Sequence, residues 1–215
     1  MHIRGLLLGF CMTCALAPSA AGQETGVDLE LALVVDSSGS VDEREFDLQL
    51  RGLADAFRDR DVIAAINAHD KGIATALVQW SGPRQQSLSV DWFVVSDQAT
   101  AEMFARRIGT AERRFGGVTA IGEVLRFSGE LLQANRFAGR RRVIDLSGDG
   151  PTNFGEYPGG PRDRVIAAGI TVNGLAIVNE FPELSDYYAE HVIGGDGAFV
   201  MTATDYRDFA RAMRV

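Results

Sequence analysis

Short apolar segments alternate with amphipathic ones along most of the chain. Residues 31–35 form an uninterrupted apolar run that stops at Asp36, which is typical of a strand buried on both faces. Residues 41–57 then place apolar side chains at helical spacing, with charged residues between them. The same alternation predicts further strands over residues 73–80, 87–95, 143–146, 170–177 and 198–201, and further helices over residues 97–114, 119–135, 162–168, 183–191 and 205–213.

The order of these elements defines the expected fold class. Strands that alternate with helices predict a single doubly wound α/β domain, in which a mostly parallel central sheet has helices on both faces. Residues 73–80 and 87–95 are close enough in sequence to pair as a hairpin around Gly82 and Pro83. Ligands of such sheets bind at the carboxyl ends of the strands, so a functional site is expected at that edge.

The first 22 residues have the three-part pattern of a secretory signal sequence. His2 and Arg4 precede an apolar run over residues 6–16, and small residues follow it up to Gly22. The run is about half of the roughly 20 residues that span a bilayer, which disfavours a membrane anchor. Cleavage after Ala21 or Gly22 is expected to leave one domain over residues 23–215, located in the periplasm or secreted.

Charge and cysteine content narrow the possible partners of this mature chain. Cys11 and Cys14 lie inside the predicted signal sequence, so the mature chain has neither disulfides nor cysteine-ligated metals. The whole chain carries a net charge of −8, and loss of Arg4 makes the mature chain more acidic still. An acidic surface is a poor partner for nucleic acid or for anionic membranes, and no stable membrane insertion is expected.

Three loops at predicted strand ends or helix starts carry oxygen donors. Residues 36–40, Asp-Ser-Ser-Gly-Ser, follow the first strand directly. Residues 116–120, Gly-Gly-Val-Thr-Ala, lead into a predicted helix, and residues 147–150, Ser-Gly-Asp-Gly, follow another strand. The expected topology brings these loops to the same edge of the sheet.

The donors in these loops form an oxygen-only set that consists of Asp36, Ser38, Ser40, Thr119 and Asp149. Hydroxyl and carboxylate oxygens suit Mg²⁺ in octahedral geometry, with Mn²⁺ or Ca²⁺ as alternatives. Because most of the expected ligands are neutral, the ion keeps affinity for a carboxylate from outside the chain. Aspartate and serine also cap helices, so residues 36–40 alone are equally consistent with a plain helix start.

The spacing of these residues resembles the metal-ion-dependent adhesion site, or MIDAS, of von Willebrand factor A and integrin inserted domains. The resemblance implies that Ser38 and Ser40 contact the metal and that Thr119 contacts it directly or through water. It further implies that Asp36 and Asp149 hold coordinated waters, and that an Asp or Glu of a protein partner completes the coordination.

A closer resemblance extends over residues 27–214. Residues 143–153, 168–174 and 187–200 are similar to a family of exported bacterial proteins of unknown function, which carry an A-type domain over nearly their whole mature length. This resemblance supports the fold and the site and implies little about the partner.

The chain departs from the adhesion-site pattern in its third loop. Ser147-Gly148 stands where A domains usually have a threonine immediately before the aspartate, so Asp149 is expected to lie slightly differently. Asp145 interrupts an otherwise apolar strand, where burial of a lone carboxylate is costly. Two interpretations stay open: Asp145 pairs with an arginine among residues 140–142, or it supports the metal loop from below.

The sequence also predicts which residues surround the site. Trp80 lies at a strand end and is the aromatic residue most expected to face the site. The glycine- and proline-rich residues 151–161 are expected to form part of a recognition rim. His69 is interpreted as a loop residue, and His191 as a structural residue near a helix end.

Three functions are compatible with this set of residues, and a non-enzymatic metal-dependent binding module is the prediction. The first alternative is a hydrolase, with Ser38 or Ser40 as nucleophile or a metal-activated water. The sequence has no Gly-x-Ser-x-Gly elbow, and a serine–histidine pair would need His69 or His191. The second alternative is a metal-free scaffold, which the complete set of five donors disfavours.

Overall fold

The computed structural model describes residues 24–213 and confirms the predicted fold class. The predicted signal sequence, residues 1–22, lies outside the described residues. The strands are β1 (Thr25–Asp36), β2 (Ile73–Trp80), β3 (Gln86–Val95), β4 (Phe137–Gly148), β5 (Thr171–Ile177) and β6 (Val200–Ala203). The helices are α1 (Glu43–Ala56), α2 (Arg60–Asn67), α3 (Gln98–Gly109), α4 (Ile121–Ala134), α5 (Gly159–Ala167), α6 (Leu184–His191) and α7 (Phe209–Ala212).

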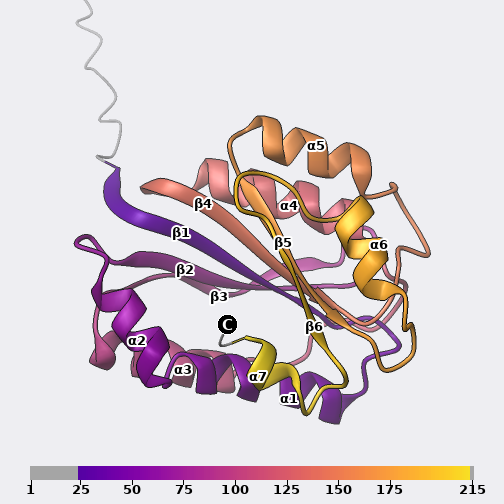
Figure 1. The fold of residues 1–215 in the computed structure, drawn as a ribbon, viewed down its shortest axis with the longest axis horizontal. Coiled ribbons are helices and arrows are strands. Elements are labelled where there is room, and N and C mark those ends of the chain that lie inside the picture. The colour runs from indigo at the N-terminus through magenta and orange to yellow at the C-terminus, as the bar shows by residue number, and fades with distance from the viewer. Residues whose placement is uncertain (1–23, 214–215) are drawn as a thin grey trace, which may run out of the picture.

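The strands form one sheet in the order β3-β2-β1-β4-β5-β6 (Figure 1). β1 pairs in parallel with β2 on one side and β4 on the other, and only β3, in the predicted hairpin with β2, runs antiparallel. The chain moves outward in one direction after β1 and in the other after β4. The carboxyl ends of β1 and β4 therefore flank the point where the strand order reverses, which is where α/β sheets bind ligands.

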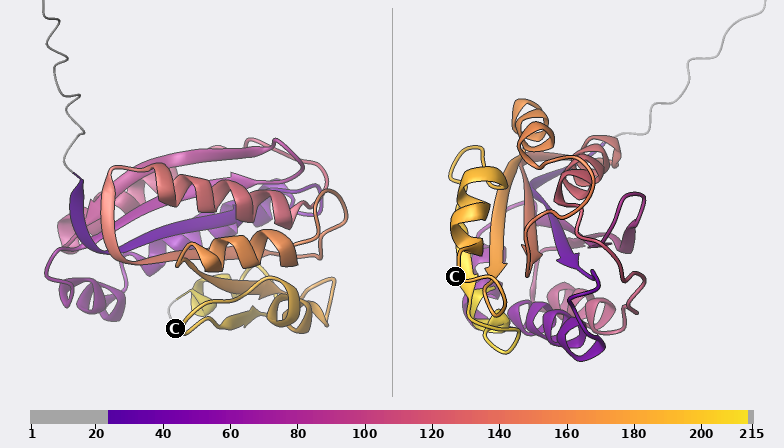
Figure 2. Two further views of the ribbon diagram at one scale, coloured as in Figure 1. Left: turned by 90° about the horizontal axis from the view of Figure 1, so that it is seen from above. Right: turned by 90° about the vertical axis from the view of Figure 1, so that its right-hand side faces the viewer.

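Helices cover both faces of the sheet because the strands bury side chains in both directions (Figure 2). Leu33 of β1 joins a core cluster with α1, α2, α3 and α7, whereas the neighbouring Val34 joins a second cluster with α4, α5 and α6. This alternation explains the uninterrupted apolar run of β1, since successive side chains point to opposite faces. None of the helices in the described part of the chain is long and apolar enough to cross a membrane.

Several element boundaries differ from the sequence predictions. β1 and β4 each begin earlier than predicted, because their polar first halves pair with each other from Thr25 and Phe137 onward. α2 was not predicted; it begins after Asp59, whose side chain accepts a hydrogen bond from the Asp61 amide. The helix predicted over residues 97–114 ends at Gly109.

The early end of α3 has a tertiary cause. The Gln79 side chain donates to the Glu112 carbonyl (2.8 Å) and accepts from the Arg114 amide (3.0 Å). These backbone groups are thereby satisfied outside a helix, and residues 110–120 form an extended connection to α4 instead. This connection carries the second of the three predicted metal loops.

Candidate functional site

The structure brings the three predicted metal loops together at the carboxyl edge of the sheet. β1 ends at Asp36 and β4 at Gly148, and Thr119 lies just before α4. The Gly39 amide donates to the Gly117 carbonyl (2.7 Å), which joins the first loop to the second. The Ser40 hydroxyl donates to Asp149 Oδ1 (2.8 Å), which joins the first loop to the third.

The two serine hydroxyls have a spacing that suits one small cation. Ser38 Oγ and Ser40 Oγ lie 3.2 Å apart. Neighbouring ligands of an octahedral Mg²⁺, each about 2.1 Å from the ion, are separated by about 3 Å. Because Ser40 directs its proton to Asp149, it accepts from the Ser38 hydroxyl with one lone pair and keeps the other for a cation.

Asp36 is a fully buried carboxylate with only one oxygen in a hydrogen bond. Its Oδ1 accepts from the Ser38 amide (2.6 Å), whereas Oδ2 is buried without a partner in the described part of the chain. Burial, and next the negative charge of Asp149, raise the pKa of Asp36 to about 7. An unsatisfied buried carboxylate oxygen is costly, and a cation or its water shell would supply the missing partner.

Asp149 is held by two hydroxyl donors. Ser40 donates to Oδ1, and the Tyr206 hydroxyl donates to Oδ2 (2.9 Å). Tyr206 lies between β6 and α7 and is almost fully buried. Burial and the charge of Asp149 raise the pKa of Tyr206 well above its usual value, so this phenol stays a hydrogen-bond donor. Sequence reasoning missed Tyr206 because it lies 57 residues from Asp149 without any local motif.

Thr119 is positioned by the segment that follows the third loop. Its amide donates to Asn153 Oδ1 (2.8 Å), and its carbonyl accepts from the amides of Asn153 (3.0 Å) and Phe154 (3.3 Å). Asn153 and Phe154 of the predicted rim therefore lie beside Thr119, whereas residues 159–161 belong to α5; a role of this segment in recognition stays a prediction. Thr119 itself is nearly buried, at 5% exposure.

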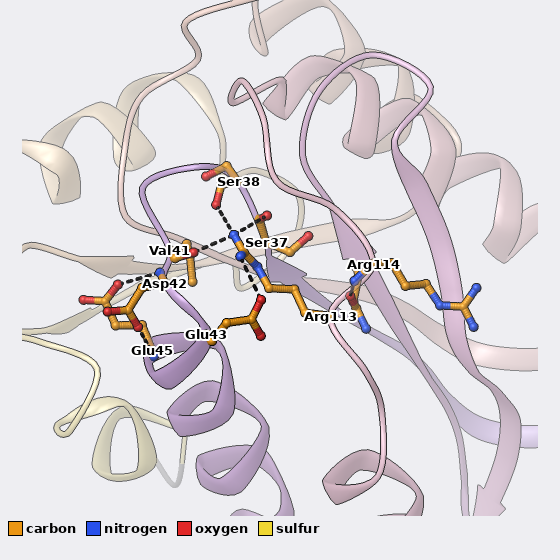
Figure 3. A network of polar contacts seen from close by, with 9 residues as sticks. Ser37, Ser38, Val41, Asp42, Glu43, Glu45, Arg113 and Arg114 are labelled. Atoms are coloured by element: carbon orange, nitrogen blue, oxygen red, sulfur yellow. Dashed lines mark hydrogen bonds and ion pairs between the residues drawn. The ribbon is translucent and has the colours of Figure 1, made fainter.

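Arg113 fixes the backbone of the first loop and was not identified from the sequence (Figure 3). Its Nη2 donates to three carbonyls, those of Ser37 (3.2 Å), Ser38 (2.8 Å) and Val41 (2.6 Å). Its Nη1 lies 3.4 Å from the Glu43 carboxylate. One cation thus holds three carbonyls of the loop together. The periodicity that placed Arg113 in a helix concealed this role.

The expectation that Trp80 is exposed at the site is wrong, although its ring lies near Asp36: a side-chain carbon added at position 148 would lie 3.3 Å from the ring and 3.0 Å from Asp36 Oδ2. The Trp80 side chain is fully buried in the core. Its backbone nevertheless supports the first loop, because its carbonyl accepts from both the amide and the hydroxyl of Ser37 (2.9 Å each). Gln49 of α1 adds a further support: it donates to the Asp36 carbonyl (2.9 Å) and accepts from the Ser147 hydroxyl (3.2 Å).

The pairing of Asp145 with an arginine among residues 140–142 is wrong, and its support of the metal loop stays a prediction. Its Oδ1 accepts a hydrogen bond from Asn173 Nδ2 (2.8 Å) on the neighbouring strand. Arg140 pairs with Asp28 instead (3.2 Å), and Arg142 donates to the Ala168 carbonyl. Asp145 lines a cavity of about 60 Å³ between the sheet and α7, and burial raises the pKa of its carboxyl group.

The two histidines of the described residues, His69 and His191, form no hydrogen bond with the hydroxyl of Ser38 or Ser40. His191 packs edge-on against Tyr157 and Tyr187, with ring centroids 5.1 and 5.0 Å apart, which fits its structural interpretation. His69 lies in the turn after α2. Within residues 24–213 no three His, Cys, Asp or Glu side chains gather as a metal site, so the candidate site depends on hydroxyl oxygens beside its two carboxylates.

Solved structures of other proteins share this fold. Proximal thread matrix protein 1 (PTMP1) of the mussel byssus superposes with a TM-score of 0.69 at 18% identity, over 90% of this chain and 48% of that one. The pilus adhesin SpaC of Lactobacillus rhamnosus GG gives 0.61 at 14% identity, over 86% and 29%. The minor pilin PilB of Streptococcus sanguinis gives 0.59 at 17% identity, over 91% and 61%.

These likenesses confirm the von Willebrand A fold that the sequence resemblance implied. The chain spans less than two thirds of each of the three proteins. A further PTMP1 structure, with a TM-score of 0.63 at 17% identity over 90% of this chain and 48% of that one, is described as having a zinc-occupied MIDAS motif. No curated protein matches the chain in sequence, whereas a family model described as "Protein of unknown function (DUF1194)" matches residues 26–215.

Proposed function

The chain belongs to the DUF1194 family, whose function is unknown, and we propose that it is an exported binding module that recognises a protein partner through a divalent cation. Ser38, Ser40 and Thr119 would hold the cation, with Asp36 and Asp149 beside it. The cation, Mg²⁺ in preference to Mn²⁺ or Ca²⁺, would act as a Lewis acid. The carboxylate of an Asp or Glu of the partner would coordinate it.

The observation that carries this proposal is the hydrogen-bonded row from Ser38 through Ser40 to Asp149. The distances of 3.2 and 2.8 Å join two loops that are 109 residues apart in sequence. In this series of hydrogen bonds the hydroxyl protons point toward the Asp149 carboxylate, and the serine oxygens keep lone pairs that can bind a cation. Asp36 Oδ2 is buried without a partner within the described residues and lies close to Gly148, so it adds an acceptor next to the third loop.

The surroundings favour binding over hydrolysis. A serine nucleophile needs a neighbouring base, and no hydrogen bond among the described residues joins His69 or His191 to Ser38 or Ser40. The proteins that share the fold are named as a thread matrix protein, a pilus adhesin and a minor pilin. These names favour a binding role outside the cytoplasm, in line with the predicted signal sequence.

Isothermal titration of Mg²⁺, Mn²⁺ and Ca²⁺ into metal-stripped protein tests the proposed site. We expect saturable binding of one ion per chain, weakened at least about tenfold in Ser38→Ala and Ser40→Ala, since each loses a ligand. Ser185→Ala is the matched control, because this exposed serine also lies beside a second hydroxyl, that of Thr202 (2.7 Å). Unchanged binding by folded Ser38→Ala and Ser40→Ala proteins rejects the site.

A second titration tests the proposed partner chemistry. Acetate added to the metal-loaded protein is expected to bind, and to lose this binding when EDTA removes the metal. Acetamide has nearly the same shape without the charge and serves as the control ligand. Acetate binding that is independent of metal contradicts a metal-bridged partner.

A further inference from the structure

Exposed apolar side chains concentrate beside the candidate metal site. The large hydrophobic side chains that are exposed in the described part of the chain are Met103, Val118, Phe154, Tyr157, Phe181 and Phe199. Three of them, Val118 (39% exposed), Phe154 (59%) and Phe181 (43%), come from three different loops and adjoin the metal loops. We refer to Val118, Phe154 and Phe181 as the apolar rim.

Each member of the apolar rim has a fixed relation to a predicted metal-site residue. Val118 directly precedes Thr119, and the Phe154 amide donates to the Thr119 carbonyl (3.3 Å). Phe181 lies over Gly150, the residue after Asp149; a side-chain carbon added at position 150 would lie 3.5 Å from the Phe181 ring. The apolar rim therefore follows the second and third metal loops.

The other side of the site has a different character. A polar groove beside α1 and the β6–α7 connection is lined by Asp42, Arg44, Glu45, Asp205 and Arg207, among others. Its three carboxylates outnumber its two guanidinium groups, and the whole chain carries a net charge of −8. A partner segment with several acidic residues would be repelled here, whereas a single carboxylate can be drawn to a cation.

We infer that the partner presents one acidic residue flanked by large apolar side chains, and that these side chains pack on the apolar rim while the carboxylate reaches the cation. This inference rests on the proposed function. Exposed apolar side chains on soluble proteins mark interaction surfaces, and Val118 and Phe154 both adjoin Thr119, the first along the chain and the second through a backbone hydrogen bond. The partner segment is thus aromatic or aliphatic around a lone Asp or Glu.

Three short peptides titrated into the Mg²⁺-loaded protein test the inference. They are acetyl-Leu-Asp-Phe-amide, acetyl-Gly-Asp-Gly-amide and acetyl-Leu-Asn-Phe-amide. We expect the first to bind about tenfold more tightly than the second, because burial of roughly 55 Å² of apolar surface accounts for this ratio. The asparagine peptide should bind more weakly than either aspartate peptide.

Variants of the apolar rim distinguish the contribution of this surface to peptide binding from that of the metal site. Phe154→Ser combined with Phe181→Ser should reduce the affinity for the Leu-Asp-Phe peptide to that for the Gly-Asp-Gly peptide, with Mg²⁺ affinity unchanged. Phe199→Ser is the matched control, because Phe199 is 45% exposed but precedes β6, where its amide bonds to Asn173. In methyl NMR spectra, the Val118 signals should shift more with the Leu-Asp-Phe peptide than with the Gly-Asp-Gly peptide.

The outcomes distinguish failure of the inference from failure of the proposed function. Equal affinities for the two aspartate peptides, in a protein that binds both only with Mg²⁺, overturn the apolar rim and leave the metal-bridged function intact. An asparagine peptide that binds as tightly as its aspartate counterpart, or binding unaffected by EDTA, contradicts the proposed function itself. Loss of the tenfold preference in Phe199→Ser also overturns the assignment of the surface.

Discussion

Tyr188 accounts for the glycine that stands immediately before Asp149. The adhesion-site pattern usually has a threonine there, but a side-chain carbon at position 148 would lie 2.6 Å from the Tyr188 hydroxyl. Gly174 makes room for the same ring, because a carbon there would lie 2.6 Å from Tyr188 Cδ1. The departure of the third loop from the pattern thus follows from its packing against α6.

We expect Gly148→Thr to lower the free energy of unfolding by about 1–3 kcal/mol, the usual effect of overpacking a core. Adding Tyr188→Phe should restore part of this loss, because it removes the oxygen nearest to the new side chain. Tyr188→Phe alone should be close to neutral, since its buried hydroxyl has no hydrogen-bond partner within residues 24–213. Urea unfolding measures all three, and a Gly148→Thr protein as stable as wild type would contradict this explanation.

Arg113 is the second single residue with a large expected effect. Arg113→Gln removes a charged donor from three carbonyls of the first metal loop. We expect the unfolding free energy to fall by about 1–3 kcal/mol, and Mg²⁺ affinity measured by titration to fall with it. Arg114→Gln is the control, because this exposed neighbour points away from the loop (Figure 3). Unchanged Mg²⁺ affinity in folded Arg113→Gln protein would rule out a role for the guanidinium in shaping the site.

At the scale of elements, β4 carries a half-buried carboxyl group, that of Asp145, that responds to pH. Burial raises the pKa of Asp145 above its ordinary value of 3.8, so the folded chain holds this proton more tightly than the unfolded chain. Its contribution to stability is therefore fully present below pH 3.8 and is lost as the pH rises through the raised value. The Asn173 hydrogen bond lowers the pKa but does not cancel the effect of burial.

Asp145→Asn should consequently gain stability relative to wild type as the pH rises from 4 to 7. The asparagine does not titrate, and its carbonyl oxygen can still accept from Asn173. Urea unfolding across this range gives the comparison, with Asp70→Asn, in the exposed turn after α2, as the control. Parallel stability profiles for wild type and Asp145→Asn would show that the carboxyl group is not perturbed by burial.

A helix or strand can be predicted from the sequence when the residues that determine its course lie within it. Apolar periodicity is sufficient to predict β2, β5 and the course of α4, because the side chains that each of them buries recur regularly in its own sequence. The end of α3 is not predictable in this way, since the Gln79 side chain on β2 forms hydrogen bonds with the backbone of residues 112 and 114. Tertiary hydrogen bonds override local periodicity there.

The candidate site likewise has a part that can be predicted from local sequence and a part that cannot. Its oxygen donors are recognisable from spacing within three short loops. The side chains that brace these loops are not, because the contacts of Arg113 and Tyr206 reach across 72 and 57 residues. Only the folded topology brings them to the donors that they hold.

At the scale of the whole molecule, the strand order explains why one edge of the sheet bears the candidate site. β1 and β4 are adjacent, and the chain departs from them in opposite directions. The loops after these strands therefore lie side by side at one edge of the sheet, where Ser40 of one bonds to Asp149 of the other. Residues 110–120 contact the first of these loops through the Gly39–Gly117 hydrogen bond, and the apolar rim lies along the second and third metal loops only.

Metal binding at this position should stabilise the entire domain, because the three loops belong to different parts of one cooperative fold. At a free Mg²⁺ concentration of about 100 times the dissociation constant, the unfolding free energy should rise by about 2.7 kcal/mol over the value in EDTA. Urea unfolding with and without Mg²⁺ gives this difference, and Ser40→Ala protein serves as the control. Equal stabilisation of wild type and Ser40→Ala would place the ion elsewhere.

The location of the ion tests the central claim most directly. Crystals of the protein grown with Mn²⁺ would reveal the metal by its anomalous scattering. We predict one strong peak within coordination distance of the Ser38 and Ser40 hydroxyls, next to Thr119 and between Asp36 and Asp149. A peak elsewhere, or none while Ser40 remains bonded to Asp149, would contradict a metal-dependent binding site on this domain.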